Sequence, residues 1–241
     1  MNFTKMKKLS VIIPAYNEEN RITEALLDVD TVLSKQSFEY EILVINDGSK
    51  DNTVSVVSAL QKDIKNLVLI DNDLNHGKGW AIKEGMHIAT GDIRLFMDAD
   101  NSTRIEEIFK MLPYIDQGFD VVIGSRYIQG SHIVIKQPWG RVFFGKIFRI
   151  ISHILIPVGV NDLVCGFKIF TEKSASIIFP KQTIFGWAFD IEILMLARKN
   201  NLKIKEIPVT WRDRRDSDVK VSGMMQTFIE MIQIRFNLWF D

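Results

Sequence analysis

The sequence predicts an α/β fold in which helices flank a mostly parallel β-sheet. Short apolar segments alternate with segments that place apolar residues at helical spacing, which is the pattern of consecutive strand–helix–strand units. Each of the first four apolar segments runs directly into a polar turn. The length of 241 residues is typical of one domain with a full hydrophobic core.

The first four strands are expected at residues 9–13, 41–45, 67–70 and 93–97. We expect the first to end at Pro14, because proline cannot donate a ladder hydrogen bond. Helices are expected between the strands, where apolar residues recur every three or four positions. In the first two helices these residues are Ile22, Ala25, Leu26, Val29, Leu33, Val54, Val57 and Leu60. Further elements are a helix at about 80–89, a helix at 104–112 and a strand at 120–124.

The polar turns that follow the strands are expected to meet in one cleft. Crossovers between parallel strands are right-handed, so every strand-to-helix turn lies on the same edge of the sheet. Ligands of open α/β sheets bind outside this edge, at the carboxyl ends of the strands. The cleft should therefore be lined by residues 14–19, 46–51, 75–79 and 98–102.

Asp98 and Asp100 are the candidate metal ligands. They follow the strand at 93–97 and stand one residue apart, so both carboxylates leave the sheet edge on the same side. Mg²⁺ is commonly held by one or two carboxylates together with phosphate oxygens of a substrate. The alternative is a solvated turn whose acids only cap the helix at 104–112.

Four other residues of the predicted cleft carry groups suited to a nucleotide. Tyr16 offers a flat ring and a hydroxyl, and Glu18 and Asp47 offer acceptors for a base or a ribose. Lys78 lies between two glycines, a combination that suits a phosphate or the close approach of a ribose. For Asp47 the alternative is a helix cap with turn chemistry. The Lys78 loop lacks the spacing of Walker and dinucleotide-binding motifs, so those classes are not indicated.

Composition narrows the function classes. Thirty basic and thirty acidic residues cancel, so no global charge favours nucleic acid. Cys165 is the only cysteine, which excludes an intrachain disulfide. The apolar run near the N-terminus reaches Pro14 too early for a signal peptide, and no apolar stretch approaches the roughly 20 residues that cross a bilayer. We therefore expect a cytoplasmic protein.

Two segments of the second half are candidates for a membrane surface. In residues 139–156, polar side chains cluster on one side, typical of an interfacial helix or of a core helix with a solvated face. These are Lys146, Arg149, Ser152 and His153. In the C-terminal segment, Gln226, Glu230, Gln233 and Asn237 recur at helical spacing opposite an apolar, aromatic face. That helix is expected to lie on a bilayer, to form a dimer seam or to cap the sheet.

Four motifs together resemble the nucleotide-sugar half of family 2 glycosyltransferases. They are SVIIPAYNEE at 10–19, NDGSKDNT at 46–53, GKG at 77–79 and DAD at 98–100. The resemblance implies a GT-A fold. It also implies that Asp98 and Asp100 hold a diphosphate bound to Mg²⁺ or Mn²⁺, with Ala99 between them in the donor site. The resemblance further implies that five residues surround the nucleoside: Pro14, Ala15, Tyr16, Glu18 and Asp47.

The motifs DLVCGFK at 162–168 and WAFDIEIL at 187–194 narrow the resemblance to dolichyl-phosphate β-glucosyltransferases and other polyprenyl-phosphate glycosyltransferases. This branch implies inverting transfer of a hexose, glucose from UDP-glucose being the nearest parallel, to a lipid phosphate at the cytoplasmic membrane face. Asp190 would contact sugar hydroxyls or orient the acceptor, with a helix cap as its alternative. Cations must offset repulsion between two phosphorylated substrates. We expect these from Arg126, Arg141, Arg214 and Lys220.

One domain is expected, with a nucleotide-sugar half at about 9–125, an acceptor half at about 126–221 and the C-terminal helix at 222–241. Asp100, Arg126 and Asp190 are the expected catalytic residues. Two other reactions stay open. Family 2 transfer to a sugar hydroxyl would need a firm general base, here Asp190. Nucleotidyl transfer would release pyrophosphate, and a non-enzymatic interaction module would not bind a nucleotide sugar.

Overall fold

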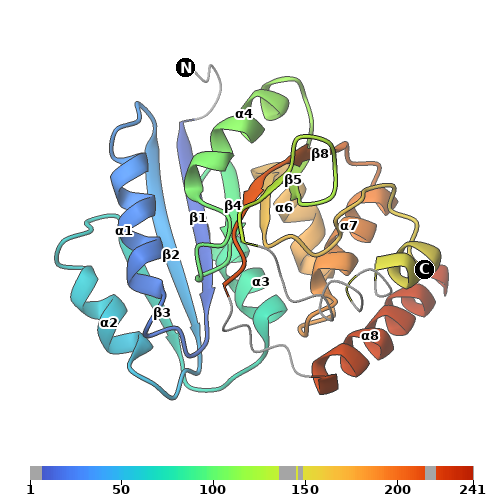
Figure 1. Ribbon diagram of the computed structural model, residues 1–241, viewed down its shortest axis with the longest axis horizontal. Helices are drawn as coiled ribbons and strands as arrows, with labels where there is room; N and C mark the ends of the chain where they lie inside the picture. The colour runs from blue at the N-terminus through green and yellow to red at the C-terminus, as the bar shows by residue number, and fades with distance from the viewer. Residues whose placement is uncertain (1–6, 136–144, 146–148, 215–220, 241) are drawn as a thin grey trace.

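A seven-stranded sheet forms the centre of the computed structural model, which describes residues 7–135, 145, 149–214 and 221–240 (Figure 1). The strand order is β3-β2-β1-β4-β7-β5-β8. The first four strands are β1 (Lys8–Ala15), β2 (Glu39–Asp47), β3 (Leu67–Asn72) and β4 (Ile93–Met97), and they are mutually parallel. The predicted α/β class with a mostly parallel sheet is therefore confirmed.

An antiparallel strand that the apolar pattern did not predict lies near the middle of the sheet. This strand, β7 (Phe167–Thr171), pairs with β4 on one side and with β5 (Val121–Ser125) on the other. β5 in turn pairs in parallel with β8 (Ile204–Pro208). Because β7 runs against β4, its start lies beside the carboxyl end of β4. There the Asp98 N–H donates to the Gly166 carbonyl at 3.2 Å.

β1 is longer than predicted and continues through Pro14. It pairs with β2 from Lys8↔Glu39 to Ala15↔Asn46, but with β4 only as far as Ile12↔Phe96. The prediction that the strand stops at Pro14 is therefore wrong. One side of β1 is already open beyond Ile12, and an open side is where a strand tolerates a proline.

Helices cover both faces of the sheet (Figure 1). One face carries α1 (Ile22–Leu33), α2 (Thr53–Leu60) and α4 (Ile108–Asp116), the last after a 3₁₀ turn at Ile105–Glu107. The other carries α3 (Lys78–Ile88), α6 (Glu172–Ile178), α7 (Phe189–Lys199) and α8 (Val221–Phe240). The five apolar residues predicted for the first helix face are all buried. Alternating residues of β1 serve the two cores, Ile12 on one side and Val11 and Ile13 on the other.

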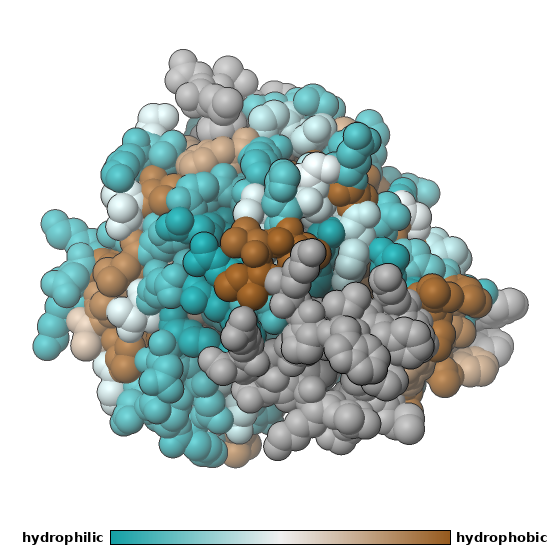
Figure 2. Space-filling model, viewed as in Figure 1, coloured by the Kyte–Doolittle hydropathy of each residue, from teal (hydrophilic) through white to brown (hydrophobic). Residues whose placement is uncertain are grey.

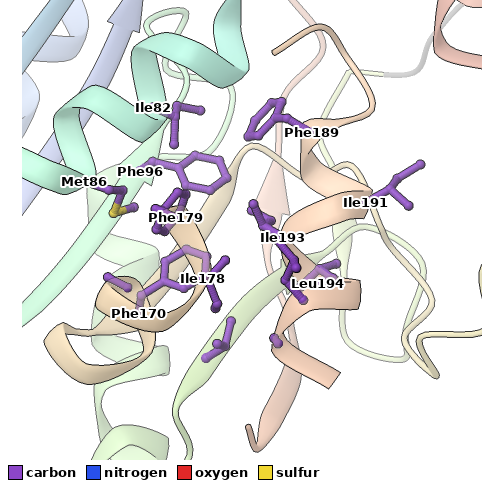
Figure 3. Close-up of a cluster of buried hydrophobic side chains, with 14 of the residues drawn as sticks. Ile82, Met86, Phe96, Phe170, Ile178, Phe179, Phe189, Ile191, Ile193 and Leu194 are labelled. Carbon is purple, nitrogen blue, oxygen red and sulfur yellow. The ribbon is translucent and has the colours of Figure 1, made fainter. Parts of the chain in front are cut away.

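Aromatic packing joins the first four strands to the second half of the chain (Figure 3). The Phe96 ring of β4 lies with its centre 6.1 Å from that of Phe170 in β7 and 5.9 Å from that of Phe189 in α7. Phe170 in turn meets Phe179 edge-on at 5.2 Å. Rings at these separations pack favourably. The start of α7 is thereby held against the end of β4.

The expected solvated polar face at 139–156 is wrong within its described part, a helix at residues 149–155. Ser152 is buried with its Oγ 3.3 Å from Met231 Sδ, and His153 places its ring nitrogens 2.6 and 2.8 Å from the carbonyls of Arg149 and Val160. Lys146 lies outside the described residues. No helix in the described part of the chain is apolar over the length that a bilayer crossing requires.

Candidate active site

The first two polar turns meet at the carboxyl edge of the sheet, as predicted. Asn17 N donates to Ser49 Oγ (3.0 Å), and Asn17 Oδ1 accepts from Lys50 N (2.8 Å). The Glu18 N–H donates to the Thr53 hydroxyl at 2.8 Å. Asn17 has φ 56°, a left-handed conformation that asparagine tolerates better than most residues. Pro14 and Ala15 are buried below this junction, and the ring of Tyr16 is exposed above it.

Asp47 fixes the third turn. Its two carboxylate oxygens accept hydrogen bonds from the backbone N–H groups of His76 and Gly77, both at 2.8 Å. The residue is buried and does not cap α2, so the cap part of the alternative is wrong, whereas the bonds of its carboxylate to a turn fit the predicted turn chemistry. Gly77 has φ 103°, and a side chain there would also meet the Phe185 carbonyl at 2.4 Å. A contact between Asp47 and a nucleoside stays a prediction.

Lys78 connects this turn to the acidic pair. It begins α3, and its Nζ lies 2.5 Å from Asp98 Oδ1 and 5.8 Å from the centre of the Trp187 ring. Burial lowers the pKa of Lys78, but Asp98 and then Asp190 outweigh burial and raise the pKa to about 12. Lys78 is therefore a cation at neutral pH, directly beside the predicted diphosphate site.

Asp98 and Asp100 leave the sheet together where β4 ends at Met97. Asp100 Oδ1 accepts a hydrogen bond from Ser102 N at 2.9 Å. Asn101, the residue between these two, has φ 55°. The following 3₁₀ turn begins after Arg104 without a side-chain cap, so the cap alternative for the two acids is wrong. Burial and then the nearby Asp98 charge raise the pKa of Asp100.

The acidic pair fits a divalent cation that is also held by a substrate. A cation between the carboxylates would favour the ionised form of Asp100, which burial and Asp98 disfavour. No group of three or more His, Cys, Asp or Glu side chains suited to a metal occurs in the described part of the chain. The protein would therefore supply two carboxylates, and phosphate oxygens and water the other ligands, which is the usual arrangement for Mg²⁺.

Glu18 faces the same acidic pair. Its carboxylate receives two hydrogen bonds from Arg21, from Nε at 2.7 Å and from Nη2 at 2.9 Å. Burial raises the pKa of Glu18 to about 7, with Arg21 opposing the rise and Asp100 and Asp98 adding to it. Three carboxyl groups thus lie together at the carboxyl edge of β1 and β4, and a cation bound there would favour their ionised forms.

Asp190 is buried in an ion pair. It lies in the first turn of α7, is 4% exposed, and its Oδ1 accepts from the equally buried Lys168 Nζ. Lys168 also donates to the Cys165 carbonyl at 2.7 Å. Burial raises the pKa of Asp190, and Lys168 and Lys78 oppose the rise. Asp190 does not cap α7, so that alternative is wrong, and a contact with sugar or acceptor stays a prediction.

Arg126 also has a buried carboxylate partner. Its Nε and Nη2 donate to the two oxygens of Asp162 at 2.7 and 2.8 Å, and its backbone N–H donates to the same side chain. Burial would raise the pKa of Asp162, but Arg126 outweighs burial and holds that pKa below its ordinary value. Two of the N–H donors that Arg126 was expected to offer a phosphate are thus used within the protein.

Arg214 lies beside the first turn, in a region that also contains Glu24 and Asp213. It helps to line a cavity of about 410 Å³ together with Arg21 and Arg212, and its Nη2 contacts Glu24 at 2.8 Å. The Arg212 N–H donates to the Ser102 carbonyl at 2.9 Å, so the cavity lies close to the acidic pair. Arg141 and Lys220, the other predicted phosphate ligands, lie outside the described residues.

Gly166, Asp162 and Lys168 are site residues whose roles sequence reasoning missed. A side-chain carbon at Gly166 would lie 2.1 Å from Asp98 Oδ2, so only glycine leaves room for the carboxylate there. All three belong to the motif at 162–168, but a motif does not state which carboxylate faces which cation. One feature of the sequence could have indicated the role of Lys168. It is a lysine within an otherwise apolar segment, and a buried lysine requires a partner of opposite charge.

A mostly parallel α/β sheet with two carboxylates and a lysine at the carboxyl edge of its strands is the arrangement of the GT-A fold. Similar folds occur in glucosyl-3-phosphoglycerate synthase from Mycobacterium tuberculosis (TM-score 0.72, 20% identity, 95% of this chain and 80% of that one). Mannosyl-3-phosphoglycerate synthase from Rubrobacter xylanophilus is also similar (TM-score 0.72, 16% identity, 96% and 74%).

Sequence comparison identifies the family. Residues 10–178 match the model of glycosyl transferase family 2, and the chain belongs to this family. It is 37% identical to the dolichyl-phosphate β-glucosyltransferase of Dictyostelium discoideum over 95% of this chain and 74% of that protein. It is 32% identical to the protein of the same name from Homo sapiens, over 86% of this chain and 68% of that one. The predicted family and its enzymatic class, a hexosyltransferase, are confirmed.

Proposed function

We propose that this enzyme transfers glucose from UDP-glucose to a polyprenyl phosphate, with inversion at the sugar. The main support is that Asp98, Asp100 and Lys78 lie together at the carboxyl edge of the sheet. There they would bind the metal-bound diphosphate that departs from the sugar. Similarity to dolichyl-phosphate β-glucosyltransferases along most of the chain supports the donor sugar and the acceptor class.

The engagement of Asp190 favours a phosphate acceptor over a sugar hydroxyl. A hydroxyl needs a general base, and the residue expected to act as one is buried against Lys168. A phosphate monoester has its second pKa near ~6, so most of it is already dianionic at neutral pH and needs little help from a base. Lys168 and Asp190 instead hold the start of α7 beside the donor site.

Basic side chains are the groups that a phosphate acceptor needs. Lys78 carries its charge beside the proposed diphosphate, and Arg212 and Arg214 line the cavity next to the acidic pair, together with Glu24 and Asp213. Arg21 also lines this cavity, but two of its N–H groups already donate to Glu18. Arginine forks suit phosphate oxygens, so this cavity is our candidate for an acceptor-phosphate site. Arg126, which was also expected to bind the phosphate, is paired with the buried Asp162.

Asp98 and Asp100 would hold Mg²⁺ or Mn²⁺, which when bound supplies Lewis-acid stabilisation of charge on the leaving diphosphate. The test is Asp100→Asn. Asparagine keeps an oxygen for Ser102 N and removes a carboxylate that burial disfavours, so the folded state should be as stable as before. We expect turnover to fall by about 100-fold or more with unchanged thermal unfolding, and unchanged turnover would contradict the assignment.

A donor and acceptor screen separates the rival reactions. Purified enzyme is incubated with UDP-glucose, other UDP-sugars or GDP-mannose, and with a polyprenyl phosphate or the matching polyprenyl alcohol. We expect UDP release and a glycolipid mass only with the phosphate. Transfer to the alcohol or to a free sugar would favour the hydroxyl reaction, and pyrophosphate release from an NTP would favour nucleotidyl transfer. A lipid acceptor also supports action at a membrane surface, and the cytoplasmic face of that membrane stays a prediction.

A further inference from the structure

Two helices expose apolar side chains where a water-facing surface is normally polar. The helix at 149–155 and α8 lie side by side, joined by the contact between Ser152 and Met231. Figure 2 shows hydrophobic surface at the right edge of the molecule, where Figure 1 places these two helices. The exposed residues, here named the apolar patch, are Ile150 (58%), Ile154 (75%), Ile229 (54%), Ile232 (47%) and Phe236 (58%).

Some polar side chains of the same helices point inward, whereas Gln226, Gln233 and Asn237 of α8 are exposed. Glu230 of α8 is buried and accepts from Ala188 N and from Gln226 Nε2, each at 3.0 Å. Ser152 is buried, and both ring nitrogens of His153 are bonded to carbonyls. The inner face of α8, which also includes buried Met231 and Ile234, therefore anchors it to the protein. Exposure of the patch is consequently a fixed property of the fold.

The charge around the patch fits an anionic surface. Residues 149–155 contain no acidic residue, and the only one in 226–237 is the buried Glu230. The same two stretches carry Arg149 and Arg235. A twofold dimer through this patch would bring like charges together, whereas an anionic lipid surface would attract them. An apolar face with flanking cations and without exposed acids is typical of helices that lie in a bilayer interface.

We propose that the apolar patch docks the enzyme on an anionic lipid bilayer. This inference rests on the proposed function, because a polyprenyl phosphate resides in the bilayer and the enzyme must meet it there. The helix that carries part of the patch also contacts the active-site region. Glu230 holds the backbone of Ala188, the residue before α7, whose neighbour Trp187 lies over Lys78. The three candidate roles of the C-terminal helix thus resolve into an inner face that packs and an outer face that binds lipid.

Flotation with lipid vesicles tests the proposal. The variant I150S/I154S/I229S/I232S/F236S is compared with the wild type and with a control, L27S/V68S/L74S. The control replaces similarly exposed apolar residues in the first half of the chain. Vesicles are phosphatidylcholine with phosphatidylglycerol, or phosphatidylcholine alone. We expect the wild type and the control to float with anionic vesicles and the patch variant to partition at least about 10-fold less. Burying even one such side chain is worth more than that factor.

Two further measurements make the outcome decisive. Ile154→Asp changes the most exposed residue alone and should weaken flotation without affecting folding, so it serves if the multiple variant unfolds. Transfer to a short, water-soluble polyprenyl phosphate should be the same in all variants, because the patch does not line the active site. Equal flotation of the wild type and both patch variants would overturn the proposal. So would a wild-type dimer in solution that Ile154→Asp dissociates. If the wild type floats with anionic vesicles but transfers sugar to no polyprenyl phosphate, the proposed function is refuted and the docking proposal is not.

Discussion

Gly166→Ala should impair the donor site strongly while lowering the stability of the fold only slightly. The methyl carbon of alanine would lie 2.1 Å from Asp98 Oδ2 and 2.4 Å from its Cγ, well inside ordinary contact. Gly166 has no left-handed φ, so the substitution introduces a steric conflict and no backbone strain. The carboxylate of Asp98 must therefore rotate or shift by about 1 Å, away from its position beside Lys78.

The two expected magnitudes differ strongly. Moving the partly exposed Asp98 out of its rotamer and away from Lys78 should cost only about 1–2 kcal/mol of unfolding free energy. A catalytic group misplaced by about 1 Å commonly costs about 100-fold in rate. We expect a small change in the urea midpoint, and a fall of about 100-fold in kcat/KM for UDP-glucose together with weaker metal-dependent binding of UDP.

Gly145→Ala is the matched control, because no atom of the described structure lies within 4 Å of the position of its added carbon. It should leave the urea midpoint, UDP binding and turnover unchanged. Isothermal calorimetry with UDP and Mn²⁺ measures the binding change, and a coupled assay of UDP release measures turnover. If Gly166→Ala binds UDP and Mn²⁺ as the wild type does and turns over normally, Asp98 does not hold the donor.

Three other substitutions test the buried charges. Arg126→Ala leaves Asp162 buried without its cation and should cost about 3–5 kcal/mol in urea unfolding, whereas R126M/D162L should recover most of this. A stable Arg126→Ala enzyme with a raised KM for the lipid phosphate alone would instead make Arg126 an acceptor ligand. Glu18→Gln should flatten the pH dependence of stability in metal-free protein. Burial raises the pKa of Glu18 in the folded protein to about 7, from 4.5 in the unfolded chain. The contribution of protonated Glu18 to the free energy of unfolding is therefore fully present below pH 4.5 and is lost as the pH rises through 7. At pH 8 the variant should gain on the order of 3 kcal/mol, and an unchanged slope between pH 4.5 and 7 would contradict the burial of Glu18. Asp190→Asn leaves Lys168 buried without a carboxylate and should lower stability by about 3–5 kcal/mol, with the acidic limb of the pH–rate profile unaltered. Loss of that limb with normal stability would identify Asp190 as a general base and favour a hydroxyl acceptor.

Local periodicity determined much of the fold. The α1 face from Ile22 to Leu33 and the strand at 93–97 were predicted as found, because burial on one side of a helix, or of a whole parallel strand, leaves a pattern in consecutive residues. The meeting of the polar turns also followed from sequence, because right-handed crossovers place all such turns on one edge. Asp98 and Asp100 therefore lie where their position after a strand placed them.

Pairings between distant segments were decided only by the tertiary structure. Nothing in the local pattern shows that β7 is antiparallel and brings Gly166 against Asp98, or that Arg126 and Lys168 have Asp162 and Asp190 as partners. The polarity of a residue likewise misled at Ser152, His153 and Glu230, which turn inward because buried backbone and side-chain groups bond them there. A sequence states which groups need partners, and only the packed chain determines which partners lie within reach.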